Sequence, residues 1–386
     1  MGVGERVQIM MNQFNHQRTI GIIGVTPDSQ AFILEANKLG FKTYLLSQTK
    51  KDASLVSSAD KVFTGSLDQA NIHEEFLMSC DLLVYFDESI NSSELEAIQK
   101  TIVVPQGDDL LSIAQDRVLQ KAYLESLSMN IAPYATVLKP EDIYQGIRSI
   151  GYPAVLRPNQ INPDSKDHAY FIYEESDIEE AASLLKHGTC VLESWLVSDR
   201  AFSISAVRTR VGELRLFPII EREYRNNRLF NIHVPLDLDD ELLDEMKRVA
   251  QVILGDLDYR GVASIEFIVT PAHALYVGVI HAYPTIHTRY SKAACSMSIT
   301  EAHLRAVTAL PIPHEIKENS AHLFVPFYED QIEIIDEFLT IYPDWDFTFY
   351  PITKHKNATN GEAIGHLIIK TNDHKRILET LKEKGF

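Results

Sequence analysis

Three side chains in the second half of the chain carry groups that could together hold a metal ion. Glu266 supplies a carboxylate, and His281 and His287 supply imidazole rings. Magnesium prefers oxygen ligands and would not choose imidazole. The alternative, which the sequence favours, is that both histidines are ordinary core or surface residues.

The cysteines and glycines argue against two further kinds of chemistry. Cys80, Cys190 and Cys295 lie far apart in no metal-ligand spacing, and their odd number argues against a disulfide framework. We therefore interpret them as reduced core residues. The chain has only 17 glycines, and a protein that binds phosphates through backbone amides usually has more.

An alternation of short strands and helices must position these residues. A β-branched run at 18–23 ends at Gly24, a helical pattern follows at 31–39, and 42–46 has the pattern of a second strand. This order is typical of a parallel sheet with helices on its faces. Further strands are predicted at 61–63, 82–86 and 102–104, with helices at 71–78 and 93–99. We therefore predict an N-terminal doubly wound parallel sheet.

The middle of the chain is predicted to be a mixed, largely antiparallel unit. A long helix is expected from Leu110 to a point before Pro133. Strands are then predicted at 154–157, 169–173, 189–193, 201–208, 214–221, 230–234, 262–269 and 274–280, with helices at 176–186 and 239–254. From His314 onward, a small α+β unit is predicted with helices at 330–339 and 373–384 and a strand at 366–370.

Length and charge limit the possible partners. The 386 residues suffice for two or three domains, and 36 Lys and Arg against 54 Asp and Glu give a formal net charge of -18. Such a surface repels phosphate backbones and anionic lipids, so we expect neither nucleic acid nor a membrane as partner. Residues 1–17 lack the apolar core of a signal peptide, so we predict a disordered leader and a cytoplasmic protein.

Five segments in a fixed order make the chain resemble one known family. They are IAQDRVLQKAYL (113–124), GYPAVLR (151–157), CVLESWLVSDR (190–200), GVASIEFIVT (261–270) and EAHLRAVTALPIP (301–313). With them the chain resembles the ATP-grasp ligases, most closely the N5-carboxyaminoimidazole ribonucleotide synthase family, from about residue 20 to residue 366. That family uses ATP and magnesium to activate bicarbonate and then carboxylates aminoimidazole ribonucleotide.

The resemblance implies three units after the leader. These are an N-terminal α/β (pre-ATP-grasp) domain at 18–112, a central ATP-grasp domain at 113–313 and a small C-terminal α+β domain at 314–386. The fold class expected from the resemblance is thus α/β and α+β, with the doubly wound sheet in the first unit.

The resemblance also implies an ATP site. It places Arg117 and Arg157 near the phosphates, and it makes Glu193, Ser194, Trp195 and Leu196 the hinge strand that contacts adenine through backbone groups. Arg157 stands where the family has Lys. Each arginine has an ordinary alternative, because Arg157 could be a surface residue and Arg117 a helix residue paired with a neighbouring acid.

Two parts of that implied ATP site are altered. The glycine-rich phosphate loop of the family corresponds to residues 158–169, which contain no glycine and two prolines. Proline donates no amide hydrogen and fixes φ, so this segment is a poor phosphate cradle. Ala201 stands where the family has an acid that holds the ribose, and a methyl group accepts no hydrogen bond.

The metal and acceptor sites implied by the resemblance are altered as well. Glu266 matches the first of two magnesium-bridging carboxylates, but Gly278 and Val279 stand where the family has an Asn–Glu pair. Glu88 matches an acid near the aminoimidazole. After the first strand, where the family has glycines and a Gln, this chain has Asp28, which would face an anionic phosphate.

Two hypotheses about function therefore stay open. The first is an ATP-dependent carboxylase of aminoimidazole ribonucleotide, with ATP and Mg²⁺ as cofactors and a small-molecule nucleotide as partner. The second, which the replaced positions favour, is a non-catalytic ATP-grasp paralogue that acts as a binding or regulatory protein. A ligase with another substrate is a third reading. The sequence assigns no catalytic residue, and the resemblance implies a homodimer.

Overall fold

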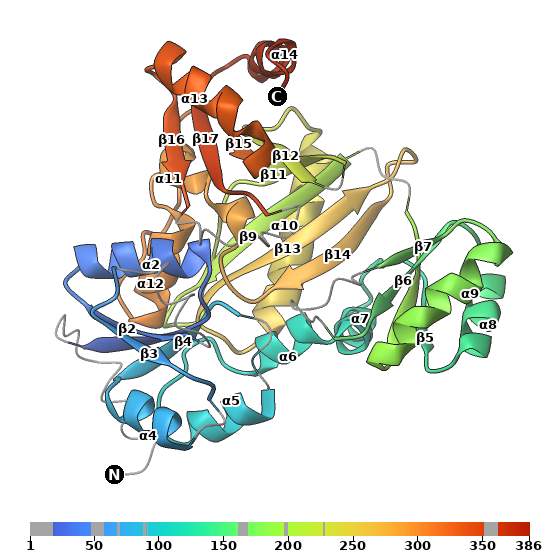
Figure 1. Cartoon of the computed structure of the whole chain (residues 1–386), viewed down its shortest axis with the longest axis horizontal. Coiled ribbons are helices and arrows are strands. Elements are labelled where there is room, and N and C mark those ends of the chain that lie inside the picture. The colour runs from blue at the N-terminus through green and yellow to red at the C-terminus, as the bar shows by residue number, and fades with distance from the viewer. Residues whose placement is uncertain are drawn as a thin grey trace.

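The N-terminal part is a four-stranded parallel sheet in the computed structural model, which describes residues 18–47, 58–67, 70–87, 90, 92–160, 169–196, 200–226, 228–350 and 362–386. Its strand order is β3-β2-β1-β4, flanked by helices (Figure 1). The elements are β1 (Thr19–Ile23), α2 (Pro27–Lys38), β2 (Lys42–Ser47), β3 (Lys61–Thr64), α4 (Ala70–Met78), β4 (Leu82–Tyr85) and α5 (Ser92–Gln99). The predicted leader and Glu88 lie outside the described residues.

The turn from β1 into α2 depends on a glycine. Gly24 has φ of +97°, and a Cβ there would lie 2.8 Å from the Cβ of Asp87, so only glycine fits without strain. Thr26 then caps α2 by accepting a hydrogen bond from the Ser29 amide, and Pro27 occupies the first turn. This local sequence fixes where Asp28 lies, at the start of the helix.

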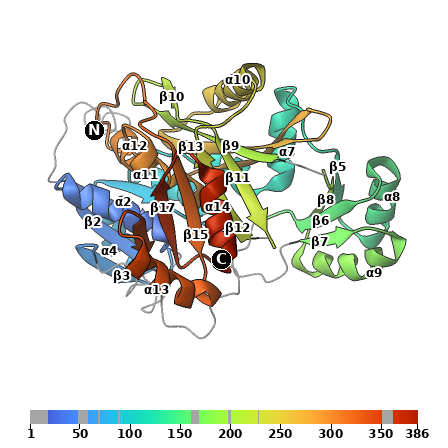
Figure 2. The same cartoon turned by 90° about the horizontal axis from the view of Figure 1, so that it is seen from above.

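A second four-stranded sheet, in the order β5-β8-β6-β7, has a hydrophobic core of its own. It is preceded by α6 (Asp109–Gln115) and α7 (Arg117–Ser126), and contains β5 (Tyr134–Val137), α8 (Pro140–Ile150), β6 (Ala154–Pro158), β7 (Tyr170–Ile172), η2 (Glu175–Asp177), α9 (Ile178–Ala181), η3 (Ala182–His187) and β8 (Cys190–Ser194). In both views it projects to the right, away from the N-terminal sheet (Figures 1 and 2).

The third sheet has nine strands and continues from the middle of the chain into its C-terminal part. Its order is β14-β13-β9-β11-β12-β15-β17-β16, with β10 paired to β9. The elements are β9 (Arg200–Arg208), β10 (Leu214–Leu216), β11 (Ile220–Arg225), β12 (Arg228–Val234), α10 (Asp240–Asp256), β13 (Gly261–Val269), β14 (Leu275–His281), η4 (Ile286–Thr288), α11 (Ser291–Ala294), α12 (Ile299–Val307), β15 (His322–Phe327), η5 (Glu329–Gln331), α13 (Ile332–Ile341), β16 (Asp346–Phe349), β17 (Gly365–Lys370) and α14 (His374–Glu383). The predicted fold class is confirmed.

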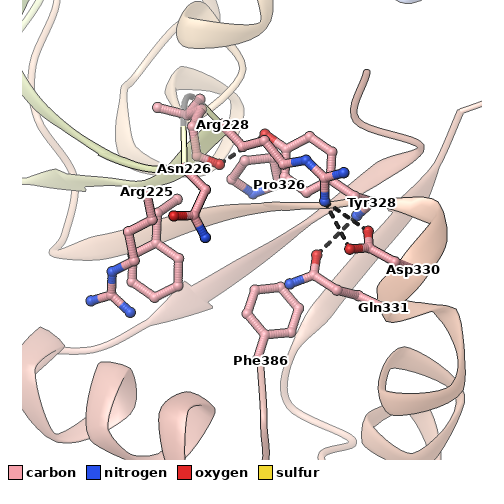
Figure 3. Close-up of a pocket in the computed structure, with 10 residues that line it drawn as sticks. Arg225, Asn226, Arg228, Pro326, Tyr328, Asp330, Gln331 and Phe386 are labelled. Carbon is pink, nitrogen blue, oxygen red and sulfur yellow. Dashed lines mark hydrogen bonds and ion pairs between the residues drawn. The ribbon is translucent and has the colours of Figure 1, made fainter. Parts of the chain in front are cut away.

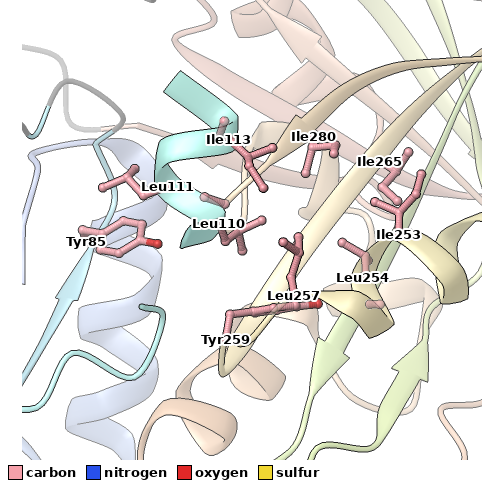
Figure 4. Close-up of a cluster of buried hydrophobic side chains, with 14 of the residues drawn as sticks. Tyr85, Leu110, Leu111, Ile113, Ile253, Leu254, Leu257, Tyr259, Ile265 and Ile280 are labelled. Atoms are coloured by element: carbon pink, nitrogen blue, oxygen red, sulfur yellow. The ribbon is translucent and has the colours of Figure 1, made fainter. Parts of the chain in front are cut away.

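Helix α6 joins the N-terminal sheet to the large sheet through apolar packing. Figure 4 shows Leu110 and Leu111 between Tyr85 at the end of β4 and the apolar residues of α10, and all of them belong to one buried cluster. Leu110 and Leu111 are fully buried. Burying a leucine contributes roughly 1.5–3 kcal/mol, so this cluster holds the two sheets in a fixed relation. No described helix is long and apolar enough to cross a membrane.

Several predicted elements were wrong in their bounds. The long helix after Leu110 is two helices, because Asp116 is extended (φ -112°, ψ 111°) and its side chain caps α7. The predicted strand at 214–221 is divided into β10 and β11 around Pro218, which cannot donate to a ladder. The helix at 176–186 is a series of short turns, and the strand at 102–104 is a single bridge at Val103.

Three strands, β5, β15 and β16, were missed, and for β15 the reason is its burial. All six of its residues are buried, so the run has none of the polar alternation that marks a half-exposed strand. The cysteines are free, as predicted, although Cys80 is only half-buried.

His303 on α12 lies at the junction of the N-terminal and large sheets. It is fully buried against the rings of Phe32 and Phe86, and its Nδ1 accepts a hydrogen bond of 2.9 Å from the Val262 amide. Burial lowers the pKa of His303 to about 3. Protonation at Nδ1 would break the hydrogen bond, so the folded protein keeps this ring neutral.

This neutral ring makes stability depend on pH. The unfolded chain binds a proton at a histidine pKa of about 6.5 and the folded chain does not, so stability falls as the pH falls through 6.5. We expect His303 to contribute a loss of about 2 kcal/mol between pH 7.5 and pH 5. In urea titrations at both pH values, His303→Gln should show a correspondingly smaller loss. His314→Gln, at an exposed position, should lose as much as the wild type. Equal losses in all three proteins would refute the assignment.

Candidate functional site

The first candidate site is a cluster of charged side chains around Glu193, at the end of β8. The Glu193 carboxylate is 15% exposed; its Oε1 lies 2.8 Å from Lys121 Nζ and its Oε2 lies 3.9 Å from Arg157 Nε. Burial alone would raise the pKa of Glu193, but Lys121, Arg157 and Arg117 outweigh it and lower the pKa. In this Glu193 cluster, three cations therefore act on one carboxylate.

Local structure brings these side chains together. Lys121 lies one helical turn after Arg117 on α7. On the small sheet, Val155 of β6 pairs directly with Glu193 of β8, and Arg157, two residues further along, shares its face. The Arg157 Nε is buried and has no hydrogen-bond partner among the described residues. A buried donor of this kind is suited to an oxyanion ligand.

Hydrogen bonds tie the start of α7 to the end of β6. Asn159 Nδ2 donates to Asp116 Oδ2 at 2.7 Å, and Asn159 Oδ1 accepts from the Val118 amide at 2.9 Å. The Arg117 Nε donates to the Pro158 carbonyl at 3.2 Å. The guanidinium of Arg117 is thus held beside the strand that carries Arg157.

The predicted hinge residues follow Glu193 directly. The Ser194 amide donates to the Pro133 carbonyl at 2.8 Å and the Trp195 amide to the Pro153 carbonyl at 2.9 Å. An adenine would therefore have to be bound by carbonyl groups or by the Leu196 amide. The Trp195 ring is 39% exposed and packs edge-on against Phe171, which gives this end of the small sheet an accessible aromatic surface.

The Lys121–Glu193 pair should contribute strongly to stability. Removing one partner of a buried ion pair leaves an uncompensated charge, at a cost of about 3–5 kcal/mol. Because Arg157 stays close to Glu193, we expect Lys121→Met to lower the free energy of unfolding by about 2–3 kcal/mol. Lys61→Met, which breaks an exposed pair with Glu75, should cost at most about 1 kcal/mol. Urea titrations of both variants test this, and equal losses would contradict it.

The second candidate site is the Glu266 network on the large sheet. Glu266 of β13 is bound by the guanidinium of Arg222 from β11, and its Oε1 lies 3.0 Å from His281 Nε2. The Nδ1 of His287 lies 3.7 Å from the same oxygen, and Tyr224 Oη lies 3.1 Å from His287 Nε2. The structure therefore brings together the three side chains that the sequence raised as a metal set, and adds an arginine to them.

The electrostatics of the Glu266 network are those of an internal ion pair. Burial alone would raise the pKa of Glu266, but Arg222, His281 and His287 hold it well below its usual range. Burial and the Arg222 charge lower the pKa of His287 to about 3, so this ring is neutral. The carboxylate is thus balanced by Arg222.

This donor set does not fit magnesium. Glu266 is its only carboxylate, since the adjacent strand presents Gly278 and Val279, and magnesium binds imidazole poorly. A guanidinium already bonded to the carboxylate would repel a divalent ion as well. We therefore derive no step through magnesium at this position.

The third candidate site is an ion pair between Asp28 at the start of α2 and Arg289 after η4. Arg289 Nε lies 2.8 Å from Asp28 Oδ1, and both side chains are largely buried. The Arg289 guanidinium lies 4.3 Å over the Tyr350 ring, and Tyr350 Oη lies 2.8 Å from His366 Nδ1. The Asp28–Arg289 pair therefore connects the N-terminal sheet, the segment after β14 and the C-terminal strands.

A pocket of about 500 Å³ lies beside the turn between β11 and β12 (Figure 3). It is lined by Arg225, Asn226, Arg228, Leu229, Phe230, Pro326, Tyr328, Asp330, Gln331 and Phe386. Arg228 bonds both oxygens of Asp330 at 2.8 and 2.9 Å, and the Arg225 guanidinium lies 3.4 Å over the Phe230 ring. The two arginines are thus already engaged by neighbouring side chains.

Two family models match the chain in the regions just described. Residues 122–278 match the ATP-grasp domain, and residues 17–115 match the ribonucleotide synthetase preATP-grasp domain. The chain is therefore an ATP-grasp protein with a pre-ATP-grasp domain. Within that class it is a divergent relative of the N5-carboxyaminoimidazole ribonucleotide synthases.

The similarity to those synthases extends over nearly the whole chain. The synthase of Bacillus subtilis (strain 168) is 27% identical over 365 residues, covering 95% of this chain and 94% of the relative. The synthase of Staphylococcus aureus (strain MRSA252) is 26% identical over 362 residues, covering 94% and 95%. An ADP complex of an N5-carboxyaminoimidazole ribonucleotide synthetase, 26% identical, superposes with a TM-score of 0.87 over 95% and 96% of the two chains.

The structure thus brings Arg117, Arg157 and Glu193 into one cluster, beside Ser194, Trp195 and Leu196. Glu266 lies in a separate network, and Glu88 lies outside the described residues. No role is predicted from the sequence for Lys121, Arg222 or Arg289. Lys121 could have been found from its spacing of four residues after Arg117. Arg222 and Arg289 contact partners far away in the sequence, so no local pattern marks them.

Proposed function

We propose that this chain binds an adenine nucleotide at the Glu193 cluster and does not carboxylate aminoimidazole ribonucleotide, so that it acts as a non-catalytic binding or regulatory protein. The observation that carries the proposal is the presence of three cations around one buried carboxylate, with a buried Arg157 Nε that has no hydrogen-bond partner among the described residues. Nucleotide phosphates are the oxyanions that such a cluster would bind. A relative of this fold has been solved with ADP.

The place where the resemblance puts the ribonucleotide acceptor, which we call the acceptor side, supports the absence of carboxylation. By the resemblance, the residues after β1 approach the ribonucleotide, and here that place holds the carboxylate of Asp28. Its partner Arg289 is bound to it at 2.8 Å. An anionic ribonucleotide would meet a neutral ion pair instead of uncompensated cations, which gives little attraction for a phosphate.

The active synthase is the alternative, and the near-complete coverage of the synthases by this chain favours it. It predicts phosphate release that depends on aminoimidazole ribonucleotide, bicarbonate and ATP together. Our proposal predicts nucleotide binding without that release. A cytoplasmic location and a homodimer remain predictions.

Nucleotide binding is tested by thermal melts with ATP. At one hundred times the dissociation constant, a ligand stabilises the fold by roughly 2.7 kcal/mol, which raises the melting temperature by about 2 °C or more. We expect this shift with the wild type, and we expect Arg157→Met and Arg117→Met each to weaken ATP binding about tenfold, because each removes a charge-assisted hydrogen bond. Arg248→Met, which removes an exposed charge on α10, is the matched control.

No shift at millimolar ATP would refute nucleotide binding. A shift that both site variants retain in full would refute its location at the Glu193 cluster.

Carboxylation is tested separately by phosphate release. We expect no increase above the ATP-only rate when aminoimidazole ribonucleotide and bicarbonate are added, because Asp28 occupies the acceptor side. A substrate-dependent increase in the wild type would overturn the non-catalytic proposal and support the active synthase.

A further inference from the structure

We propose that the guanidinium of Arg222 takes the place of a divalent cation at Glu266, so that this chain binds its nucleotide without a divalent cation. The inference rests on the proposed function for its nucleotide part. The other part, that Arg222 excludes a divalent cation from Glu266, does not depend on nucleotide binding.

Sheet register explains how Arg222 reaches Glu266. Strand β9 lies between β11 and β13, and pairs Ala201 with Arg222 on one side and Ser203 with Glu266 on the other. Cross-strand partners share a face, and residues two apart on β9 do too, so all four side chains point to the same side. The small side chains of Ala201 and Ser203 leave Arg222 room to cross β9.

Other hydrogen bonds hold Arg222 in this position. Its Nη2 donates to the Phe202 carbonyl at 3.2 Å, and its Nη1 donates to Tyr224 Oη at 3.1 Å as well as to Glu266. Arg222 is 5% exposed. Because the guanidinium is fixed by three different partners, it stays beside the carboxylate.

The hydrogen bonds of Tyr224 and His287 in this network need no metal. Tyr224 Oη accepts from Arg222, so its own proton points to His287 Nε2, 3.1 Å away. Because Nε2 accepts that proton, His287 carries its own proton on Nδ1, which faces Thr285 Oγ1 at 3.5 Å and Glu266 Oε1 at 3.7 Å. With that nitrogen protonated, it offers no lone pair to a cation.

The competing occupant of this network is a transition metal. The ligand atoms of Glu266, His281 and His287 all lie within 4.8 Å of one another, a set that zinc accepts. Zinc would require the Nδ1 proton of His287 to leave and would bring two positive charges next to Arg222. We therefore expect the guanidinium, and no metal, at Glu266.

The first test uses the wild-type chain in two titrations. The metal-free protein is titrated calorimetrically with Mn²⁺ and with Zn²⁺, and His281→Ala is titrated in the same way. We expect no saturable binding at Glu266 with a dissociation constant below about 100 μM. Binding at Glu266 would be recognised by its loss in His281→Ala. The affinity for ATP should agree within about threefold between magnesium buffer and chelator. Saturable binding that depends on His281 would overturn the metal part, and a loss of ATP affinity of about tenfold or more in chelator would overturn the nucleotide part.

The second test rebuilds the metal site. Val279→Glu supplies a second carboxylate on the strand next to Glu266, yet alone it should give no Mn²⁺ binding, because Arg222 still balances Glu266. Adding Arg222→Met should create Mn²⁺ binding, whereas adding Arg248→Met should not. Mn²⁺ binding by the single Val279→Glu variant equal to that of the Arg222→Met double variant would refute the role of Arg222.

The two tests separate this inference from the proposed function. If ATP binds in neither buffer, the proposed function fails, and the metal titrations of the free chain still decide whether Arg222 excludes a cation. If the double variant does not fold, the wild-type titrations decide the question.

Discussion

A buried carboxylate is stable in the folded protein only when a cation pairs with it, and the candidate sites of this protein are built around such pairs. Isolated ionised carboxylates are too costly to bury unpaired. Glu193, Glu266 and Asp28 are each largely buried, and each is bonded by a lysine or arginine of the chain itself. These pairs join segments distant in sequence, so the same interactions that neutralise charge also tie α7 to the small sheet and α2 to the segment after β14.

The three pairs differ in their balance of charge, and this difference separates their possible roles. Glu266 and Asp28 are each matched by one arginine, so neither has attraction left for an anion. Glu193 is acted on by Lys121, Arg157 and Arg117 together. An anionic ligand therefore gains most electrostatic energy at the Glu193 cluster. The excess of cations at Glu193 supports nucleotide binding, and the balanced pair at Asp28 supports the absence of carboxylation. Both can therefore be proposed for the same molecule.

The fold class could be predicted from the sequence, and so could the site residues that lie within short sequence motifs. The parallel N-terminal sheet followed from strands and helices in regular alternation, and Arg117, Arg157 and Glu193 came from ordered motifs. The sequence could not supply the contacts between side chains that lie far apart in the sequence. The contact of Arg222 with Glu266 depends on strand β9 lying between them, and that of Asp28 with Arg289 spans 261 residues. Strand β15 was missed because burial on both of its faces removes the alternation of polar and apolar residues.

The small side chain of Ala201 matters for the position of Arg222 in the sheet. The resemblance counted Ala201 as a lost ribose contact and Val279 as a lost metal ligand. In the sheet, Ala201 is the cross-strand partner of Arg222, and a larger acidic side chain there would stand in its path to Glu266 or compete for its charge. A small residue at position 201 and a guanidinium at Glu266 thus fit together in this sheet. Because a buried carboxylate must be paired, the pairing of Glu266 with Arg222 depends on the space that Ala201 leaves.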